Sequence, residues 1–367
     1  MNKSKWEYKK WNDVIKIING RDYKSVVDPN GAYPICGSGG IMGYANSYLC
    51  PSETVIIGRK GNINKPIYMN RKFWNVDTAF GLVADKTILS PKYLYYFCEQ
   101  YDFDKHNKAV TIPSLTKRDL LKIVIPIPPL DFQNRIVSEL DQLSAIISLK
   151  QQQMKEYDAL AQSLFYEMFG DENNQYNGFQ TFKLSELFEV GTGSTPSRKL
   201  ENIYYGGTLN WVKTTEIHGN YISETEEKIT RKALEDTNCK MYPSNTILIA
   251  MYGQGKTRGQ TARLTAPAAT NQACAAILPK PEICNTDFLF EFFLLSYERI
   301  RNMARGGTQS NLNLSLVKSI EIPLPPLSLQ HSFAEKVKAI EHQKSLLKQS
   351  IAETQTLLDS RMQEYFG

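Results

Sequence analysis

The segment AMYGQGKT at 250–257 ends like a nucleotide-binding loop, so it is the first candidate for chemistry in this sequence. A phosphate-binding P-loop needs a glycine five residues before the glycine of its GK[ST] ending. That position is occupied by Ala250, and no acidic strand end is placed to hold magnesium. We therefore expect a glycine-rich loop that approaches a phosphate backbone, or a plain hairpin turn, instead of a nucleotide site.

Cysteine and histidine spacing gives no support for a metal site or a catalytic nucleophile. The six cysteines include no CxxC pair, and the four histidines (106, 218, 331 and 342) occur in unrelated contexts, whereas zinc sites need closely spaced ligands. A glycine-rich turn opening a βαβ unit, as cofactor-binding folds require, is not visible either. We predict a chain without a catalytic site or a metal, whose thiols are reduced and mostly buried.

Basic and polar loops point to nucleic acid instead. Net charge is only +5, but the segments 58–72 and 251–263 carry several lysines and arginines and no acid, which suits contacts to phosphates. The loop GTGSTPSRK at 191–199 adds hydroxyl groups, and RGGTQSNLN at 305–313 adds amides that can pair with adenine. Each loop taken alone could equally be a solvated turn, and the same holds for GSGG at 37–40.

From these loops, together with HNKAVTIPSLT at 106–116 and the single residue Lys213, we select the side chains and backbone expected to face DNA. They are Ser38, Gly39, Arg59, Lys60, Asn62, Lys65, Arg71, Lys72, Lys108 and Ser114 in the first half of the chain, and Thr192, Ser194, Thr195, Ser197, Arg198, Lys199, Lys213, Tyr252, Gln254, Lys256, Thr257, Arg258, Arg305, Thr308, Gln309, Ser310 and Asn311 in the second.

The chain contains a long internal repeat that must position these loops. IPIPPLDFQ at 125–133 returns 197 residues later as IPLPPLSLQ at 322–330, and the pair Phe169-Gly170 returns after the same interval as Phe366-Gly367. Solenoid repeats are about 20–50 residues long, so this repeat is a duplicated domain with its following helix. A protein built this way presents two similar surfaces, and its function should need two of something.

A long helix is predicted after each proline-rich junction, over 131–170 and 328–367. Apolar residues recur in steps of three and four in both segments, with polar interruptions that include Lys150, Lys344 and Arg361. A 3.5-residue period sustained over about five heptads indicates a coiled coil. At 1.5 Å per residue each helix would span roughly 55–60 Å, and the simplest arrangement packs one helix against the other.

Identical residues of the two helices fall beside this seam, at intervals of three or four. They include Leu149 and Leu346, and Leu160 and Leu357. A seam needs only apolar bulk, so an identical outward stripe predicts equivalent docking surfaces for two copies of one partner, although residual similarity after duplication could also explain it. The polar residues assigned to partner binding are Gln152, Glu156, Ser163, Glu167, Gln349, Glu353, Ser360 and Glu364.

The regions before the helices, 1–130 and 171–327, are predicted to be similar α+β domains with mostly antiparallel sheets. Short β-branched and aromatic runs at 54–57, 73–76 and 247–251 indicate strands, and 91–100 and 287–301 indicate short helices. No apolar run reaches the roughly 18 residues of a membrane span, and the basic N-terminus lacks the apolar core of a signal peptide. We therefore expect a cytoplasmic protein.

With these motifs assembled, the chain resembles the specificity (S) subunit of type I restriction-modification systems. The resemblance covers essentially the whole length: target domain, IPxPPLxxQ junction and long helix, each present twice. PICGSGGIMGY at 34–44, GTGSTPSR at 191–198 and GGTLNW at 206–211 look like parts of the family's target-recognition domains. The tandem of two halves is highly specific to this family, whereas each short motif alone is not specific.

The resemblance implies that 1–130 and 171–327 are target-recognition domains, separated by two antiparallel coiled-coil helices in a pseudo-twofold arrangement. Each domain would read one half of a bipartite sequence in double-stranded DNA, and the helices would fix the distance between the halves. The helices would also recruit two methyltransferase (M) subunits, and restriction/translocase (R) subunits could join. S-adenosylmethionine, ATP and magnesium would then belong to those partners, with no cofactor in this chain.

Two other functions are considered. A self-contained DNA methyltransferase would bind S-adenosylmethionine tightly as an isolated chain. A coiled-coil scaffold without DNA specificity would show no salt-dependent binding to a preferred bipartite duplex. The sequence does not reveal the bases recognised.

Overall fold

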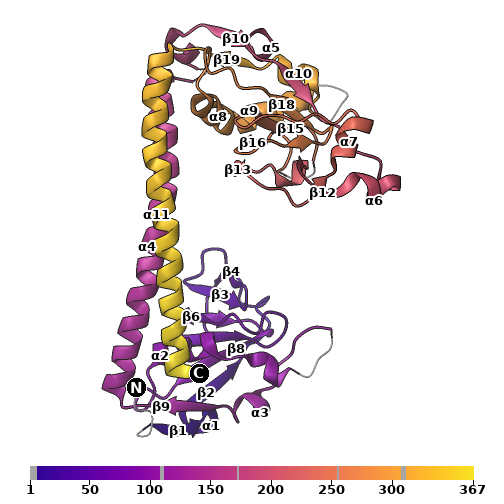
Figure 1. Cartoon of the computed structure of the whole chain (residues 1–367). Coiled ribbons are helices and arrows are strands. Elements are labelled where there is room, and N and C mark those ends of the chain that lie inside the picture. Colours follow the sequence, from indigo (N-terminus) through magenta and orange to yellow (C-terminus); the bar gives the residue numbers. More distant parts are fainter. Residues whose placement is uncertain (1–5, 108–110, 172, 254–255, 307–310) are drawn as a thin grey trace. The chain divides into compact units, whose positions relative to one another are not determined.

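The computed structural model describes residues 6–107, 111–171, 173–253, 256–306 and 311–367. Its contacts divide the chain into two compact units, Met1–Gln152 with Leu347–Gly367 as unit 1 and Gln153–Leu346 as unit 2. Two helices of 40 residues, α4 (Leu130–Phe169) and α11 (Leu327–Phe366), pass through both units (Figure 1). Each unit therefore combines one globular region with one half of each helix. No helix in the described part of the chain is long and apolar enough to cross a membrane.

Unit 1 contains a four-stranded antiparallel sheet, a smaller three-stranded sheet and a two-stranded ribbon. The large sheet has the order β2-β8-β5-β6, the small sheet β4-β3-β7, and the ribbon joins β1 to β9. The strands are β1 (Glu7–Lys10), β2 (Ile15–Asn19), β3 (Tyr33–Gly37), β4 (Gly40–Ala45), β5 (Thr54–Gly58), β6 (Ile67–Met69), β7 (Trp74–Asn75), β8 (Ala79–Ala84) and β9 (Val124–Ile127), and the helices α1 (Trp11–Val14), α2 (Pro91–Gln100), η2 (Phe103–His106) and α3 (Lys117–Leu120).

The main core of unit 1 lies between the large sheet and α2, which contacts β5, β6 and β8. Trp11 is completely buried and packs edge-on against Phe97 and Phe103. The end of α11 completes this core, because Phe366 packs against Tyr93 and Phe97 of α2. Side chains from the start and the end of the chain therefore share one apolar cluster.

Unit 2 repeats this plan with a larger sheet, in the order β11-β18-β15-β16-β13, a three-stranded sheet β14-β12-β17 and a ribbon β10-β19. The strands are β10 (Thr181–Lys183), β11 (Val190–Thr192), β12 (Tyr205–Val212), β13 (Asn220–Ile222), β14 (Lys228–Ile229), β15 (Ile247–Ala250), β16 (Thr261–Leu264), β17 (Ala269–Thr270), β18 (Cys274–Ile277) and β19 (Glu321–Pro323). The helices are η3 (Gln175–Gly178), α5 (Leu184–Leu187), η4 (Arg198–Leu200), α6 (Glu201–Tyr204), η5 (Thr214–Glu216), α7 (Arg231–Asp236), α8 (Thr286–Leu295), α9 (Tyr297–Asn302), η6 (Met303–Gly306) and α10 (Leu314–Lys318).

Most pairings in both units are antiparallel, as the α+β prediction required. The predicted strands at 54–57 and 247–251 are β5 and β15, and the helix at 91–100 is α2, whereas β7 is shorter than the predicted 73–76. The expected single helix at 287–301 is wrong. It is divided into α8 and α9 at Ser296, whose backbone leaves the helical region at φ −83° and ψ 5° after its N–H has bonded to Phe292.

Gln133, the last residue of the first proline-rich junction, ties the start of α4 to the globular region of unit 1. Its side chain is 0% exposed. The Oε1 atom accepts a hydrogen bond of 2.8 Å from the backbone N–H of Ser90, the N-cap of α2. The Nε2 group donates to the carbonyls of Ile88 at 2.9 Å and Pro128 at 2.8 Å. One buried amide thus joins a helix start, a junction and the loop before α2.

Gln330 does the same in unit 2 at the equivalent position of the repeat. It is also 0% exposed. Its Oε1 atom accepts 2.7 Å from the N–H of Asn285, the N-cap of α8, and its Nε2 donates 2.7 Å to the carbonyl of Pro325. The repeated glutamine therefore has a structural reason: a buried amide that satisfies backbone groups which would otherwise be unpaired.

The two long helices pack antiparallel in each unit, as unit 1 shows. Lys150 of α4 donates to Oγ of Ser350 at 2.7 Å and to Oγ1 of Thr354 at 3.0 Å, and Arg361 of α11 lies 2.9 Å from Glu139. Residues later in α4 thus contact residues earlier in α11, as antiparallel packing requires. Lys150 and Arg361, which interrupt the apolar pattern of the sequence, therefore bond to polar residues across the seam.

In unit 2 the corresponding halves meet through aromatic rings and an ion pair. Phe165 of α4 packs edge-on against Phe333 of α11 with ring centres 5.6 Å apart, and Lys344 reaches Asp158 at 2.7 Å. Burial and the nearby Glu341 raise the pKa of Glu291 on α8 to about 7, with Lys344 acting against them. The helix pair of unit 2 therefore carries a concentration of charge where α8 packs on it.

Replacing Gln133 or Gln330 by alanine should lower the free energy of unfolding by about 2–5 kcal/mol. Each substitution leaves at least two buried backbone groups unpaired, at about 1–3 kcal/mol each. Urea unfolding followed by circular dichroism measures the change. The exposed Gln142, whose side chain donates to Ser138 on its own helix, is the matched control and should change stability by less than about 0.5 kcal/mol. Equal losses for all three variants would contradict the anchoring role.

Candidate nucleic-acid interface

Two loops that the sequence predicts to face DNA meet in unit 1, although they lie far apart in the chain. One follows β5 and carries Arg59 and Lys60, and the other contains Ser114. The N–H of Leu115 bonds to the carbonyl of Arg59 at 2.9 Å, and Lys60 forms a β-bridge with Ser114. Arg59 and Lys60 are exposed, and Ser114 is half-buried. The backbone therefore holds two exposed cations next to a hydroxyl group.

Unit 2 joins the equivalent two loops in the same way. The N–H of Leu312 bonds to the carbonyl of Met251, at 3.1 Å, which brings Asn311 next to Tyr252. Asn311, Tyr252 and Lys256 are exposed, and the carbonyl of Lys256 accepts a 2.7 Å hydrogen bond from the hydroxyl of Tyr297. The repeat thus presents one polar loop pair per unit.

The remaining predicted residues of these loops differ in how far they are exposed. Asn62 and Lys65 are exposed, and Thr257 and Arg258 are half-buried. Five of the predicted residues lie outside the described part of the chain, and for Arg305 the side chain does. The five are Lys108, Gln254, Thr308, Gln309 and Ser310.

The hairpin of β3 and β4 presents Ser38 and Gly39 at its turn. A Cβ atom added at Gly39 would meet nothing within 4 Å, so the turn is open to solvent. Arg71 and Lys72 are exposed just before β7, which pairs with β3, and the Lys72 ammonium lies 4.6 Å from the centre of the Tyr48 ring. Cationic and polar groups therefore lie around the small sheet as well as at the loop pair.

In unit 2, the predicted cations Arg198 and Lys213 converge on a single carboxylate. Glu227 lies 2.6 Å from Arg198 and 3.3 Å from Lys213, and Lys213 also reaches Glu226 at 3.0 Å. The hydrogen bond that Arg198 donates to Glu227 raises the pKa of Arg198. These cations are already paired, and a phosphate would have to compete with Glu227 for them. Sequence spacing could not show this, because the acid is 14 residues or more away.

The loop 191–199 is fixed by hydrogen bonds to residues of other segments. The hydroxyl of Thr192 donates 3.0 Å to the carbonyl of Cys274, and the carbonyl of Ser194 accepts 3.1 Å from the indole N–H of Trp211. Thr195 bonds to the side chain of Gln272. Among the residues predicted here, Thr195, Ser197, Arg198 and Lys199 are exposed, and of these Thr195 and Arg198 are hydrogen-bonded to other side chains. Thr192 and Ser194 therefore support the loop, a role for which the sequence carried no signal beyond the nearby Trp211.

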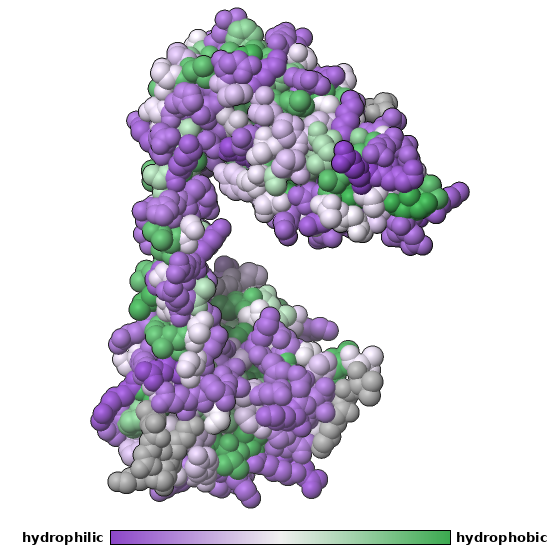
Figure 2. Space-filling view, viewed as in Figure 1, coloured by the Kyte–Doolittle hydropathy of each residue, from purple (hydrophilic) through white to green (hydrophobic). Residues whose placement is uncertain are grey.

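The outward stripe of the helices is exposed as predicted and contains four leucines. Leu149, Leu160, Leu346 and Leu357 expose between 46% and 65% of their surface. Green residues interrupt the purple surface of the helices in Figure 2. The predicted polar residues beside them are exposed, apart from the half-buried Glu364, and Gln349 donates 2.8 Å to Glu353. Both long helices therefore expose leucines at equivalent positions of the repeat.

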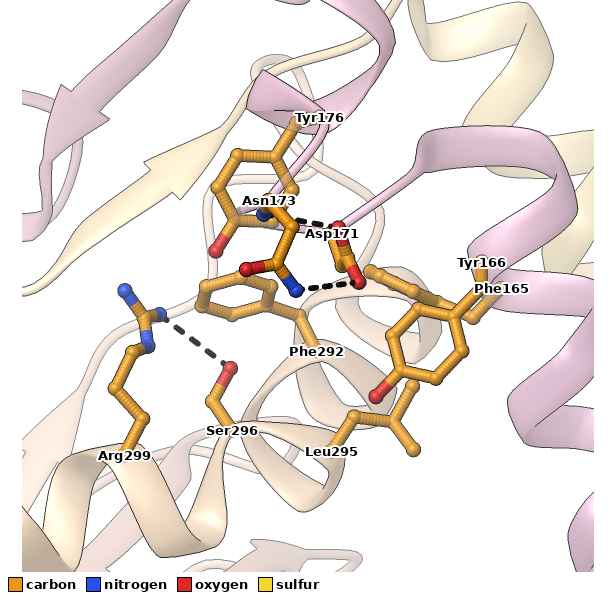
Figure 3. A pocket seen from close by; sticks show the side chains of 9 residues that line it. All are labelled: Phe165, Tyr166, Asp171, Asn173, Tyr176, Phe292, Leu295, Ser296 and Arg299. Carbon is orange, nitrogen blue, oxygen red and sulfur yellow. Dashed lines mark hydrogen bonds between the residues drawn. The ribbon is translucent and has the colours of Figure 1, made fainter.

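A cavity of about 230 Å³ in unit 2 offers no catalytic arrangement. It is lined by residues from the end of α4, the following turn, α8 and α9 (Figure 3). Several polar groups that line it are bonded to each other, since Asn173 donates to Asp171 and Arg299 donates to Ser296. In the described part of the chain no group of three His, Cys, Asp or Glu residues could hold a metal ion. Burial raises the pKa of the Cys50 thiol to about 12, so this cysteine is not a thiolate nucleophile.

Comparison with known proteins agrees with this geometry. The model of the type I restriction modification DNA specificity domain matches residues 3–157 and again 176–355. The MjaIX specificity subunit of Methanocaldococcus jannaschii is 31% identical over 157 residues, which are 41% of this chain and 35% of that protein. The MjaVIII specificity subunit of the same organism is 21% identical over 379 residues, covering 92% of this chain and 86% of that protein.

The fold is also found in a solved structure. The type I restriction-modification S subunit from M. genitalium superposes with a TM-score of 0.64 at 15% identity, covering 99% of this chain and 96% of that one. The specificity domain is thus matched twice along this chain, and the fold of the chain recurs in a solved structure. The chain belongs to the type I restriction-modification DNA specificity family.

Replacing both Arg59 and Lys60 by alanine should weaken duplex DNA binding similarly for all sequences. Each lost phosphate contact should also reduce the slope of log affinity against log salt by about 1. Binding of the full-length chain measured at several salt concentrations tests this. Lys9 of β1, which pairs with Glu7, is the control, and its alanine variant should keep the original slope. A double variant with an unchanged slope would exclude these cations from the DNA contact.

Proposed function

We propose that this protein is the non-catalytic subunit that gives a type I restriction-modification complex its DNA sequence specificity. Residues 1–130 and 171–327 would be two target-recognition domains, each reading one half of a bipartite site. The observation that carries the proposal is the duplication: equivalent loop pairs recur, joined by Leu115 to Arg59 in one copy and by Leu312 to Met251 in the other. The two loop pairs differ in side chains, as two different half-sites require.

The long helices, 131–170 and 328–367 in this proposal, would set the spacing between the half-sites. A continuous helix of 40 residues is about 60 Å long, nearly two turns of DNA at about 34 Å each. The buried anchors Gln133 and Gln330 support this role, because they fix each recognition region to its helix. The helices could set a fixed spacing only if the two regions cannot rotate freely about the helix ends.

The exposed leucines and the polar stripe beside them would dock two methyltransferase subunits, and R subunits could join that complex. Each unit contributes one leucine from each helix: Leu149 and Leu357 in unit 1, Leu160 and Leu346 in unit 2. S-adenosylmethionine, ATP and magnesium would be bound by the partners. The complex would act in the cytoplasm, where it has access to the chromosome.

Genome-wide mapping of methylated adenines, with and without the gene for this chain, tests the function. We expect one bipartite motif to disappear with the gene. Exchange of residues 1–130 for the corresponding domain of another family member should change one half of that motif and leave the other half intact. Changes in both halves, or tight binding of S-adenosylmethionine by the isolated chain, would contradict the proposal.

Replacing Leu149 by aspartate should remove one methyltransferase subunit, and the double variant with Leu346→Asp should remove both. A buried charge in an apolar contact is strongly unfavourable unless it is paired, whereas both leucines are too exposed to matter for folding. Native mass spectrometry of the reconstituted complex counts the subunits. Gln151→Asp, at an exposed position about 200° around the helix from Leu149, is the control and should keep both. Full occupancy in the double variant would exclude this stripe.

A further inference from the structure

The β3–β4 hairpin of unit 1 carries apolar side chains on its outer surface next to the open turn. Ile41 exposes 49% of its surface and Met42 58%, and Tyr44 is exposed as well. Figure 2 shows hydrophobic surface where Figure 1 places this hairpin. Neither Ile41 nor Met42 was among the residues predicted to face DNA, although only Gly40 separates them from Ser38 and Gly39, which were.

A β-bulge turns both apolar side chains outward. Successive residues of a regular strand point to opposite faces, so one of two neighbours should be covered. Here Ile35 pairs with Gly43 and Cys36 with Ile41, which leaves Met42 as an extra residue without a partner. Bulges re-aim side chains and are frequent near functional sites.

Exposed cations lie at the same end of the hairpin. A Cβ atom at Gly37 would be 3.5 Å from the sulfur of Met42 and 3.0 Å from a methyl of Val76, so the chain after Val76 runs beside the turn. That stretch holds Arg59, whose guanidinium donates 3.4 Å to the carbonyl of Asp77 and whose N–H donates 2.8 Å to Thr78. Within the described residues, no ion pair neutralises Arg59.

We propose that Ile41 and Met42 are specificity-determining residues that contact thymine C5-methyl groups in the major groove. This inference rests on the proposed function. A two-stranded ribbon fits the major groove, and apolar side chains there recognise the thymine methyl, the one apolar group on a base edge. Arg59 and Lys60 would hold the flanking phosphates and keep the hairpin in register.

A protein partner is a poorer occupant for this surface, because the tight β3–β4 hairpin is replaced in unit 2 by β12 and β14, which pair antiparallel but are joined by the long connection 213–227. The strand equivalent to β3 is the end of β12, since Trp211 pairs in parallel with Ala269 of β17 as Ile35 pairs with Trp74 of β7. After β12 the chain continues into 213–227, where Lys213 is ion-paired. Docking sites for two identical partners should be repeated, whereas readers of two different half-sites should differ.

The test uses the full-length chain assembled with its methyltransferase subunits. Selection from randomised duplexes first defines the two half-sites. Each thymine is then replaced by uracil, which removes only the methyl group, and binding is measured for the original chain, Ile41→Ser, Met42→Ser and the control Val124→Ser. Val124 is an exposed apolar residue on β9, which pairs with β1 in the two-stranded ribbon.

We expect uracil to weaken binding by about fourfold, the factor that burial of one methyl-sized group contributes. This loss should occur at one or two positions of a single half-site, and should disappear in the Ile41→Ser or Met42→Ser chain but persist in Val124→Ser. Thermal unfolding should be unchanged in all three variants, since these side chains are half exposed.

Three results would overturn the inference while leaving the proposed function intact: a half-site without thymine for this domain, equal affinity for thymine and uracil at every position, or loss of methyltransferase subunits from the hairpin variants. If selection yields no preferred bipartite sequence, the proposed function fails and this inference fails with it.

Discussion

The side-chain amides of Gln133 and Gln330 are the constraint on which the architecture depends. Each lies where a proline-rich strand ends, a 40-residue helix begins and the N-terminus of α2 or α8 is capped. Proline supplies no N–H and cannot enter the helix interior, so the junction leaves backbone groups that need partners. One buried glutamine satisfies them in each copy, and in doing so fixes the direction in which the helix leaves the domain.

The two lysines in the seam between α4 and α11 lie at positions where the two copies of the repeat have different residues. Lys150 is replaced by Leu347 at the equivalent position, and Lys344 by Ile147. The bonds from Lys150 to Ser350 and from Lys344 to Asp158 therefore form only when α4 pairs with α11. Polar residues in a coiled-coil seam specify partner and register at some expense of stability. Here they distinguish two helices that are otherwise similar enough to pair with themselves.

The sequence predicted the duplicated α+β plan, the long helices and the outward stripe, because periodicity and repeat spacing are local signals. It missed contacts between distant residues: that Glu227 pairs with both Arg198 and Lys213, or that Ser194 is held by Trp211. The break at Ser296 was missed because the apolar pattern runs through it. The bulge at Met42 depends on the register between two strands, which composition does not encode.

The contribution of α11 to unit 1 has a consequence for the order in which the protein can fold. Met362 and Tyr365 belong to the apolar cluster of unit 1, and Gln100 bonds to Gln363, 263 residues later. Unit 2, by contrast, is one uninterrupted stretch, Gln153–Leu346. During synthesis the ribosome releases every residue of unit 2 before the last turn of α11 emerges. Unit 1, most of which is synthesised first, can therefore complete its apolar core only after all of unit 2 has been synthesised.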